Sequence, residues 1–220
     1  MSIAAARPQE PATPATPEAR KQFETRVFGL LQERFGATID PLDQWGLTAV
    51  LDRNRLHDAI LFLRDEPSLR MDVLLDTVGI DYLEYPGHDL PRFAVVYVLK
   101  SSAYMAHRMR VKVRVEEDDA NVPSIHDLYA SSNWQERETW DQFGIVFTGH
   151  PNLKRLLNHC DFVGHPLRKD YPAKRGQWLL ANDPMIDQLE ARLKSKGYQI
   201  LESVAPTSPS LEETSFGRKK

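Results

Sequence analysis

The chain has 220 residues, of which 41% are apolar and one is cysteine, and its net charge at pH 7 is −3. This length suits one domain with a sizeable core. The slightly acidic balance argues against a nucleic-acid-binding protein, because that class is usually basic. One cysteine excludes an internal disulfide and an iron–sulfur cluster held by about four thiolates of this chain. No apolar run approaches the roughly 18 residues of a membrane-crossing helix.

Residues 1–17 form a low-complexity, proline-rich arm. Its prolines recur at every third residue, at Pro8, Pro11, Pro14 and Pro17. A polyproline II helix would therefore place all four rings on one face. Two interpretations stay open: a solvated, disordered arm, or a strap that becomes ordered on a neighbouring subunit. Residues 1–20 lack the apolar segment of a secretory signal.

Two amphipathic helices are predicted in the first third of the chain. The first begins near Glu18 and ends before Gly36, and its apolar face consists of Phe23, Val27, Leu30 and Leu31. The second begins after Asp52, a residue type that caps helices, and ends before Pro67. Its apolar face consists of Leu56, Ile60 and Leu63.

Strands are predicted at residues 46–51, 72–83, 93–99 and 109–115. The unbroken apolar run 93–99 indicates a central strand that is covered on both faces. Strict alternation in 109–115 places the basic side chains of Arg110, Lys112 and Arg114 together on the outer face. We expect this stripe, like the acidic loop 116–119 after it, to be solvated. The element order predicts an α+β fold, a two-layer sandwich with helices packed on one mixed or antiparallel sheet.

A short polar helix is predicted from residue 132 to Gly144. Ser132 with Gln135, or Asn133 with Glu136, could form a capping box at its start. The helix would place on one side the residues Trp134, Arg137, Glu138 and Asp141. At this spacing Arg137 and Asp141 can pair, which would leave Glu138 without a partner in the helix. Trp140 and Phe143 can face the sheet.

Two Gly-His-Pro turns follow, at residues 149–151 and 164–166. Proline restricts the histidine before it and glycine permits a sharp turn, so both are rigid corners. Residues 150–175 carry six lysines or arginines against two aspartates, a local charge of +4. A basic, turn-rich stretch without regular structure makes a poor core and a good contact surface.

These blocks carry a family resemblance. The sequence ERETWDQFGIVFTGHPNLKRLL at residues 136–157 resembles the signature of the 30-kilodalton, or C, subunit of respiratory NADH-quinone oxidoreductase (complex I). GHPLRKDYP at residues 164–172 resembles the second block of that family. The similarity extends over about residues 20–175 and includes DYLEYP, RFAVVYVL, RVKVRV and VPSIHDLY. Residues 1–17 and 176–220 lie outside it.

The resemblance implies a non-catalytic scaffold subunit of the peripheral arm, on the cytoplasmic face of the bacterial cell membrane. It implies no cofactor on this chain, with FMN and the iron–sulfur clusters on partner subunits, and contact with the quinone-site subunits of D and B type. It also implies that the subunit interface contains Glu136, Arg137, Glu138, Asp141, Arg155, Arg168, Asp170 and Tyr171. Forked arginine–carboxylate contacts suit a permanent interface. Related complexes that accept electrons from another donor contain similar C subunits.

Three other classes of function find less support in the sequence. His150, His159, Cys160 and His165 offer metal-ligand atoms, but their spacing matches no familiar zinc site. No G-x-S-x-G, H-E-x-x-H or glycine-rich phosphate loop supports a hydrolase. An RNA-binding module could use the 110–114 stripe and the 154–175 patch, but the acidic balance of the chain argues against it.

The organisation that follows is an arm at 1–17, an α+β core at 18–125, and a signature helix with an extended docking segment at 126–175. Residues 176–220 would form a C-terminal helix and a flexible tail. Asp183-Pro184 would cap that helix, whose apolar residues are Ile186, Leu189 and Leu193 and which ends at Gly197.

Overall fold

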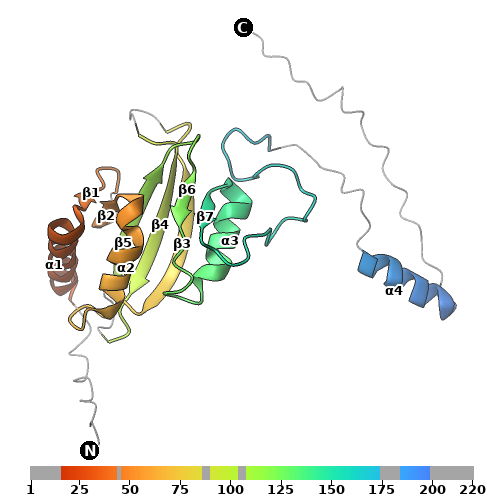
Figure 1. Cartoon of the computed structure of the whole chain (residues 1–220), viewed down its shortest axis with the longest axis horizontal. Coiled ribbons are helices and arrows are strands. Elements are labelled where there is room, and N and C mark those ends of the chain that lie inside the picture. The colour runs from red at the N-terminus through yellow and green to blue at the C-terminus, as the bar shows by residue number, and fades with distance from the viewer. Residues whose placement is uncertain (1–15, 44–45, 86–89, 104–107, 174–183, 199–220) are drawn as a thin grey trace, which may run out of the picture. The chain divides into compact units, whose positions relative to one another are not determined.

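The computed structural model describes residues 16–43, 46–85, 90–103, 108–173 and 184–198. The chain divides into two compact units, one of residues 1–160 and 164–173 and one of residues 161–163 and 174–220. The proline-rich residues 1–15 and the tail from 199 onward lie outside the described residues, so the predictions for them stay predictions. The first unit contains the sheet and the signature helix (Figure 1).

The sheet of the first unit has five strands in the order β1-β2-β5-β4-β3. Their bounds are β1 Thr38–Ile39, β2 Thr48–Leu51, β3 Val73–Asp81, β4 Phe93–Lys100 and β5 Arg108–Val115. The β2–β5 pair is parallel and the other pairs are antiparallel. Strand β4 lies inside the sheet, as its apolar run predicted, and the mixed α+β class is confirmed.

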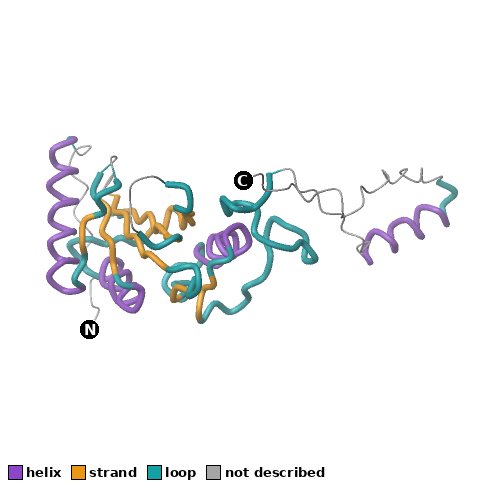
Figure 2. Tube along the Cα trace, turned by 90° about the horizontal axis from the view of Figure 1, so that it is seen from above, coloured by secondary structure: helices purple, strands orange, loops and turns teal. Residues whose placement is uncertain are grey.

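The first two helices form the second layer, on one face of this sheet (Figures 1 and 2). Helix α1, Pro17–Phe35, begins at the N-cap Thr16 and ends at Gly36, whose φ of 70° is left-handed. A 3₁₀ turn η1, Arg53–Arg55, precedes α2, Leu56–Asp65, and the Asp52 side chain caps this turn. The core between the layers consists mainly of Val27, Phe28, Leu31, Leu56, Ile60, Leu63, Phe93, Val95, Tyr97, Met109, Val111 and Val113.

Helix α3, Ser132–Phe143, lies along the edge strand β3, at the end of the sheet far from α1 (Figure 2). Gln135 Nε2 donates to the Leu75 carbonyl, and Thr139 Oγ1 donates to the Thr77 carbonyl, at 3.1 Å each. An added Cβ at Gly79 would lie 2.6 Å from the Phe143 ring, so glycine permits this close approach. The helix therefore satisfies backbone groups that an edge strand would otherwise expose.

Irregular backbone follows α3. Strand β7, Val146–Thr148, pairs in parallel with β6, Asn121–Pro123. Within the first unit, residues 150–160 and 164–173 then contain turns and bends, and we call these two stretches the docking segment. In the second unit, α4 spans Pro184–Ser195, close to the predicted bounds. Among the described residues, the structure contains no helix that is both long and apolar enough to cross a membrane.

Candidate functional site

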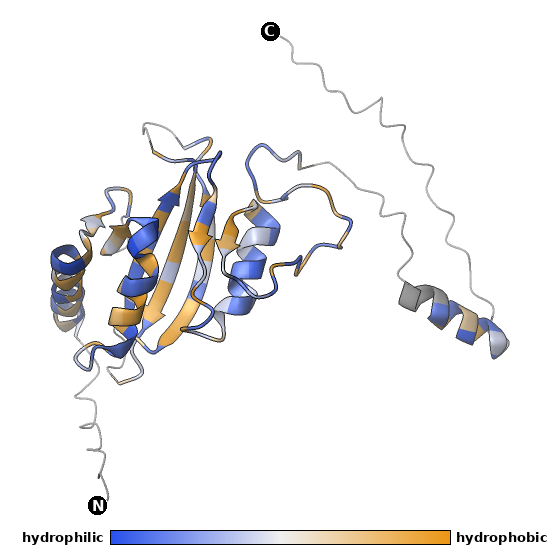
Figure 3. Cartoon of the chain, viewed as in Figure 1, coloured by the Kyte–Doolittle hydropathy of each residue, from blue (hydrophilic) through white to orange (hydrophobic). Residues whose placement is uncertain are grey.

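Helix α3 buries polar side chains, which is unusual for a helix packed on a sheet. It is drawn largely in hydrophilic colours in Figure 3, beside strands in hydrophobic colours. Yet six of its residues are buried: Ser132, Glu136, Arg137, Thr139, Asp141 and Gln142. Buried polar groups require hydrogen-bond partners, and most of these partners lie in the segments on either side of the helix.

Asp141 organises the beginning of the docking segment. Its Oδ2 accepts hydrogen bonds from the backbone N–H groups of Leu156, Leu157 and Asn158 at 2.9–3.0 Å. Its Oδ1 accepts from the Asn158 amide at 3.0 Å and from Arg155 Nη1 at 2.6 Å. Burial alone would raise the pKa of Asp141, but the bonds from Asn158 and Arg155 hold it well below its ordinary value. One carboxylate thus fixes four consecutive residues.

Two arginines extend this network. Arg155 also donates to the Gly164 carbonyl at 2.9 Å, which ties the first part of the segment to the second Gly-His-Pro turn. Arg137 donates to the carbonyls of Lys154 and Arg155 at 3.1 Å and lies 4.9 Å from the Trp134 ring centroid. The pair that Arg137 and Asp141 could have formed is replaced by contacts of both residues with the docking segment. Arg137 binds carbonyls of this segment, and Asp141 binds its Arg155 side chain.

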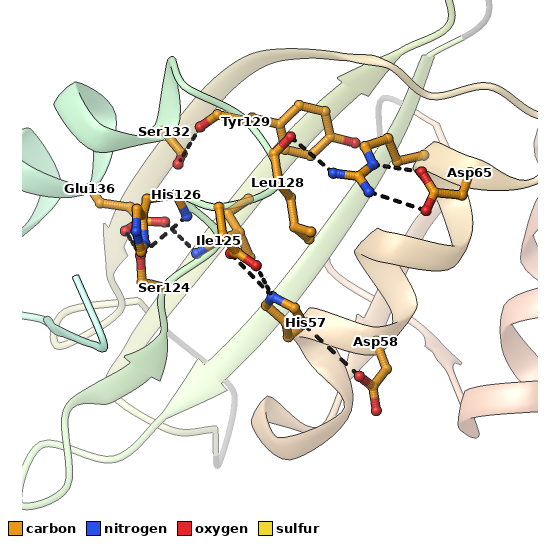
Figure 4. Close-up of polar contacts among 12 residues, drawn as sticks. His57, Asp58, Asp65, Ser124, Ile125, His126, Leu128, Tyr129, Ser132 and Glu136 are labelled. Atoms are coloured by element: carbon orange, nitrogen blue, oxygen red, sulfur yellow. Dashed lines mark hydrogen bonds and ion pairs between the residues drawn. The ribbon is translucent and has the colours of Figure 1, made fainter. Parts of the chain in front are cut away.

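Glu136 fixes the turn before the helix (Figure 4). Its carboxylate accepts hydrogen bonds from Ser124 Oγ at 2.5 Å and from the Ile125 N–H at 2.8 Å. Burial raises its pKa to about 7. The predicted capping box is wrong: the N-cap is Ser131, which makes no side-chain cap bond, and Glu136 turns inward to the 124–125 backbone.

The second turn is anchored to the end of the helix. His165 Nδ1 lies 3.0 Å from the Asp141 carbonyl, and Arg168 Nε donates to the Phe143 carbonyl at 2.5 Å. An added Cβ at Gly144, whose φ is 76°, would lie 2.5 Å from the Arg168 guanidinium. Burial lowers the pKa of His165. Glycine is thus needed at residue 144 for both the helix end and the packing of this turn.

Arg92 connects the sheet to the end of the docking segment. Its guanidinium pairs with Asp81 at 3.1 Å and with Asp170 at 2.8 Å, and it also pairs with Glu117 of the acidic loop. Asp81 in turn accepts a hydrogen bond from the Lys169 N–H at 2.9 Å. Tyr171 packs over Gly164, where an added Cβ would lie 2.9 Å from its ring.

The basic stripe of β5 is not a solvated face, contrary to expectation. Lys112 and Arg114 both pair with Asp40, whose side chain is fully buried. Arg110 pairs with Asp43 at 3.2 Å. These carboxylates lie about 70 residues earlier in the chain, in the segment after β1. A local sequence pattern therefore could not predict the ion pairs. Part of the acidic loop is paired as well, through Arg92–Glu117 and Arg53–Asp119.

The eight expected interface residues therefore fall into three groups. Glu136, Arg137 and Asp141 are buried inside the chain and bind its own groups. Partly buried positions are Arg155, Arg168 and Tyr171, and exposed positions are Glu138 and Asp170. Whether they touch partner chains stays a prediction.

Large apolar side chains are exposed on this surface, and the sequence pattern missed most of them. The structure exposes Trp134 by 59%, Leu157 by 65% and Leu167 by 54%. The helical spacing places Trp134 on the open side of the helix, but Leu157 and Leu167 lie in irregular backbone, where hydrophobic periodicity gives no signal.

Of the four candidate metal ligands, only the neighbours His159 and Cys160 come together in the part of the chain that the structure describes. His150 Nε2 lies 3.1 Å from the Asn133 carbonyl, and His165 is engaged by the Asp141 carbonyl. Cys160 lies 3.6 Å from the ring of its neighbour His159. The three histidines and the cysteine therefore do not form one metal site.

Comparison with known proteins identifies the family. A family model described as the respiratory-chain NADH dehydrogenase 30 Kd subunit matches residues 49–177. The NADH-quinone oxidoreductase C subunit of Acidithiobacillus ferrooxidans is 46% identical over 149 residues, which cover 64% of this chain and 72% of that protein. Its namesake in Roseiflexus castenholzii is 52% identical over 118 residues, which cover 54% of this chain and 65% of that protein.

Two solved structures resemble the chain. A trypsin-resistant fragment of Nqo5 superposes with a TM-score of 0.51 at 38% identity and covers 59% of this chain and 98% of the fragment. A chain of the archaeal membrane-bound sulfane sulfur reductase superposes with a TM-score of 0.53 at 21% identity and covers 84% of this chain and 96% of that chain, which shows a shared fold. Since the family model matches more than half of the sequence, the chain belongs to the respiratory-chain NADH dehydrogenase 30 Kd subunit family.

Proposed function

We propose that the chain is a non-catalytic docking and assembly subunit in the peripheral arm of a proton-pumping NADH:quinone oxidoreductase. It would lie against the quinone-site subunits of D and B type and support electron transfer from NADH to quinone without a cofactor of its own. Its relatives are named as C subunits of NADH-quinone oxidoreductase, and these names support the choice of complex. The arrangement of the docking segment supports the docking role.

The observation that carries the proposal is the way in which this segment is fixed. Asp141, Arg137 and Arg168 are engaged with backbone groups of the chain itself. The segment therefore keeps its shape without regular secondary structure, while Leu157 and Leu167 remain largely exposed. A preorganised, irregular surface with exposed apolar anchors and a polar surround is typical of stable protein interfaces.

Affinity purification of the tagged full chain from its own cells tests this role. We expect stoichiometric recovery of a large complex that contains flavin and iron–sulfur subunits. The isolated chain, in contrast, should be colourless and free of stoichiometric metal. Identification of the electron-input subunits by mass spectrometry separates an NADH-dependent complex from a relative with another donor. Recovery of the chain alone or with RNA, or a metal bound to the isolated chain, would contradict the proposal.

A further inference from the structure

The sheet carries a hollow of about 710 Å³ on the face that α1 and α2 do not cover. Its floor includes Val78, Val96 and Lys112, which lie directly opposite one another on β3, β4 and β5. Phe143 and Leu167 line it beyond the edge of β3. We call this region the sheet-face hollow. It is continuous with the docking segment, because Leu167 and Lys169 belong to both.

The charges around the hollow are unequally accessible. Two carboxylates line it, and both are sequestered: the side chain of Asp43 is 8% exposed beside Arg110, and that of Asp81 is fully buried beside Arg92. Lys169 is exposed, and the side chain of Arg110 remains 29% exposed. The lining residues include both acidic and basic side chains, but the accessible ones are basic. A group that enters the hollow therefore meets positive charge at the rim.

The apolar part of the hollow is also open. Val78 is 41% exposed and Tyr85 is 48% exposed, so this strand face presents apolar area to whatever lies against it. The floor is mostly apolar, because Lys112 is buried and already paired with Asp40, and the rim is polar and charged. This arrangement is typical of a protein-binding surface. The accessible cations favour a carboxylate on the bound partner, because complementary charge fixes the register of an interface.

We propose that the sheet-face hollow binds a segment of a partner subunit that rests an apolar side chain on Val78 and Leu167 and sets a carboxylate against Lys169 and Arg110. This inference rests on the proposed function, because it assumes that the chain assembles with other subunits. It extends the docking surface from the irregular segment around the edge of β3 to the open face of the sheet.

Photo-crosslinking in the intact complex tests the proposal. A benzophenone amino acid placed at Val78 of the full chain should capture another subunit, in a peptide that contains aspartate or glutamate. The control is the same probe at Asp58, whose side chain is 73% exposed on α2, the helix that covers the opposite face of the sheet. It should not capture that peptide. A third probe, at Leu157, reports on the docking segment independently.

Charge variants sharpen the test. Lys169→Glu should lower the yield of the Val78 crosslink by about fivefold, whereas Lys169→Arg should preserve it. An unchanged yield of the Val78 crosslink in the Lys169→Glu variant would overturn the proposal. The proposal is also overturned if the probe at Val78 captures a lipid, a second copy of this chain or nothing, while the probe at Leu157 captures a subunit. In these cases the proposed function stands. Failure of both probes to capture a subunit would contradict both.

Discussion

Asp141 and Arg155 form an ion pair of 2.6 Å that joins the last turn of α3 to the docking segment. Its two members differ in burial, since the aspartate side chain is fully buried and that of Arg155 is 14% exposed. Because Arg155 also binds the Gly164 carbonyl, the pair links the helix to the second Gly-His-Pro turn. The local fold of the segment therefore depends on one carboxylate.

Replacement of that carboxylate should destabilise the chain itself. Asp141→Ala leaves three backbone N–H groups without their acceptor and Arg155 without its partner. We expect a loss of about 3–5 kcal/mol in the free energy of unfolding. Urea denaturation of the full chain, followed by circular dichroism, measures this loss. Glu138→Ala, at an exposed position of the same helix, is the control and should change stability by less than about 0.5 kcal/mol. Equal stability of the two variants would contradict the organising role of Asp141.

Glu136 should make stability depend on pH near neutrality. Burial raises its folded-state pKa to about 7 from an ordinary value of 4.5. A carboxyl with a raised folded-state pKa contributes stability that is present below the unfolded-state value and is lost as pH rises through the folded-state value. Between pH 4.5 and pH 8 the wild-type chain should therefore lose about 2–3 kcal/mol relative to Glu136→Gln, which cannot ionise.

The comparison at each pH isolates this effect. Burial lowers the pKa of His150 and His165, and these groups act in the opposite sense over a similar pH range. They are present in both proteins and cancel in the difference. Parallel stability profiles for the wild type and Glu136→Gln would show that the bonds from Ser124 and Ile125 keep Glu136 ionised throughout.

Close contact between β3 and α3 should make residue 79 intolerant of a side chain. Gly79→Ala places a Cβ 2.6 Å from the Phe143 ring, so the helix must shift away from the strand. We expect destabilisation of about 1–3 kcal/mol. Gly29→Ala is a matched control, because Gly29 lies in α1 with nothing within 4 Å of its added Cβ, and alanine there should stabilise by about 0.5–1 kcal/mol. A Gly79→Ala chain as stable as the wild type would refute the tight packing of α3 on β3.

Regular elements were predictable from sequence because their burial follows a period. The strand 109–115 and the faces of α1 and α2 follow spacings of two or about 3.6 residues, and the structure places them as expected. The unbroken apolar run 93–99 likewise forms a strand that is buried on both faces. The sequence predicted where α3 begins and where it ends at Gly144, but it did not predict which residues face the interior. Its interior positions carry Glu136 and Asp141, which a hydrophobic pattern assigns to solvent.

The polar contacts could not be predicted from the sequence for a related reason. Glu136 binds backbone 11 residues earlier, Asp141 binds backbone up to 17 residues later, and Lys112 pairs with a residue 72 positions away. These distances match no helical or strand spacing. Only the folded chain shows that the basic side chains of β5, which we expected to be solvated, neutralise buried carboxylates.

The central claim is that the docking segment contributes to assembly and takes no part in chemistry. Leu157→Glu tests it most directly, because Leu157 is 65% exposed and its replacement should leave the unfolding midpoint of the free chain unchanged. The measurement is NADH:quinone turnover normalised to the amount of assembled complex. The account predicts less assembled complex with near-normal turnover per complex. Full assembly with severely reduced turnover would contradict it, because the segment would then act in quinone or proton chemistry.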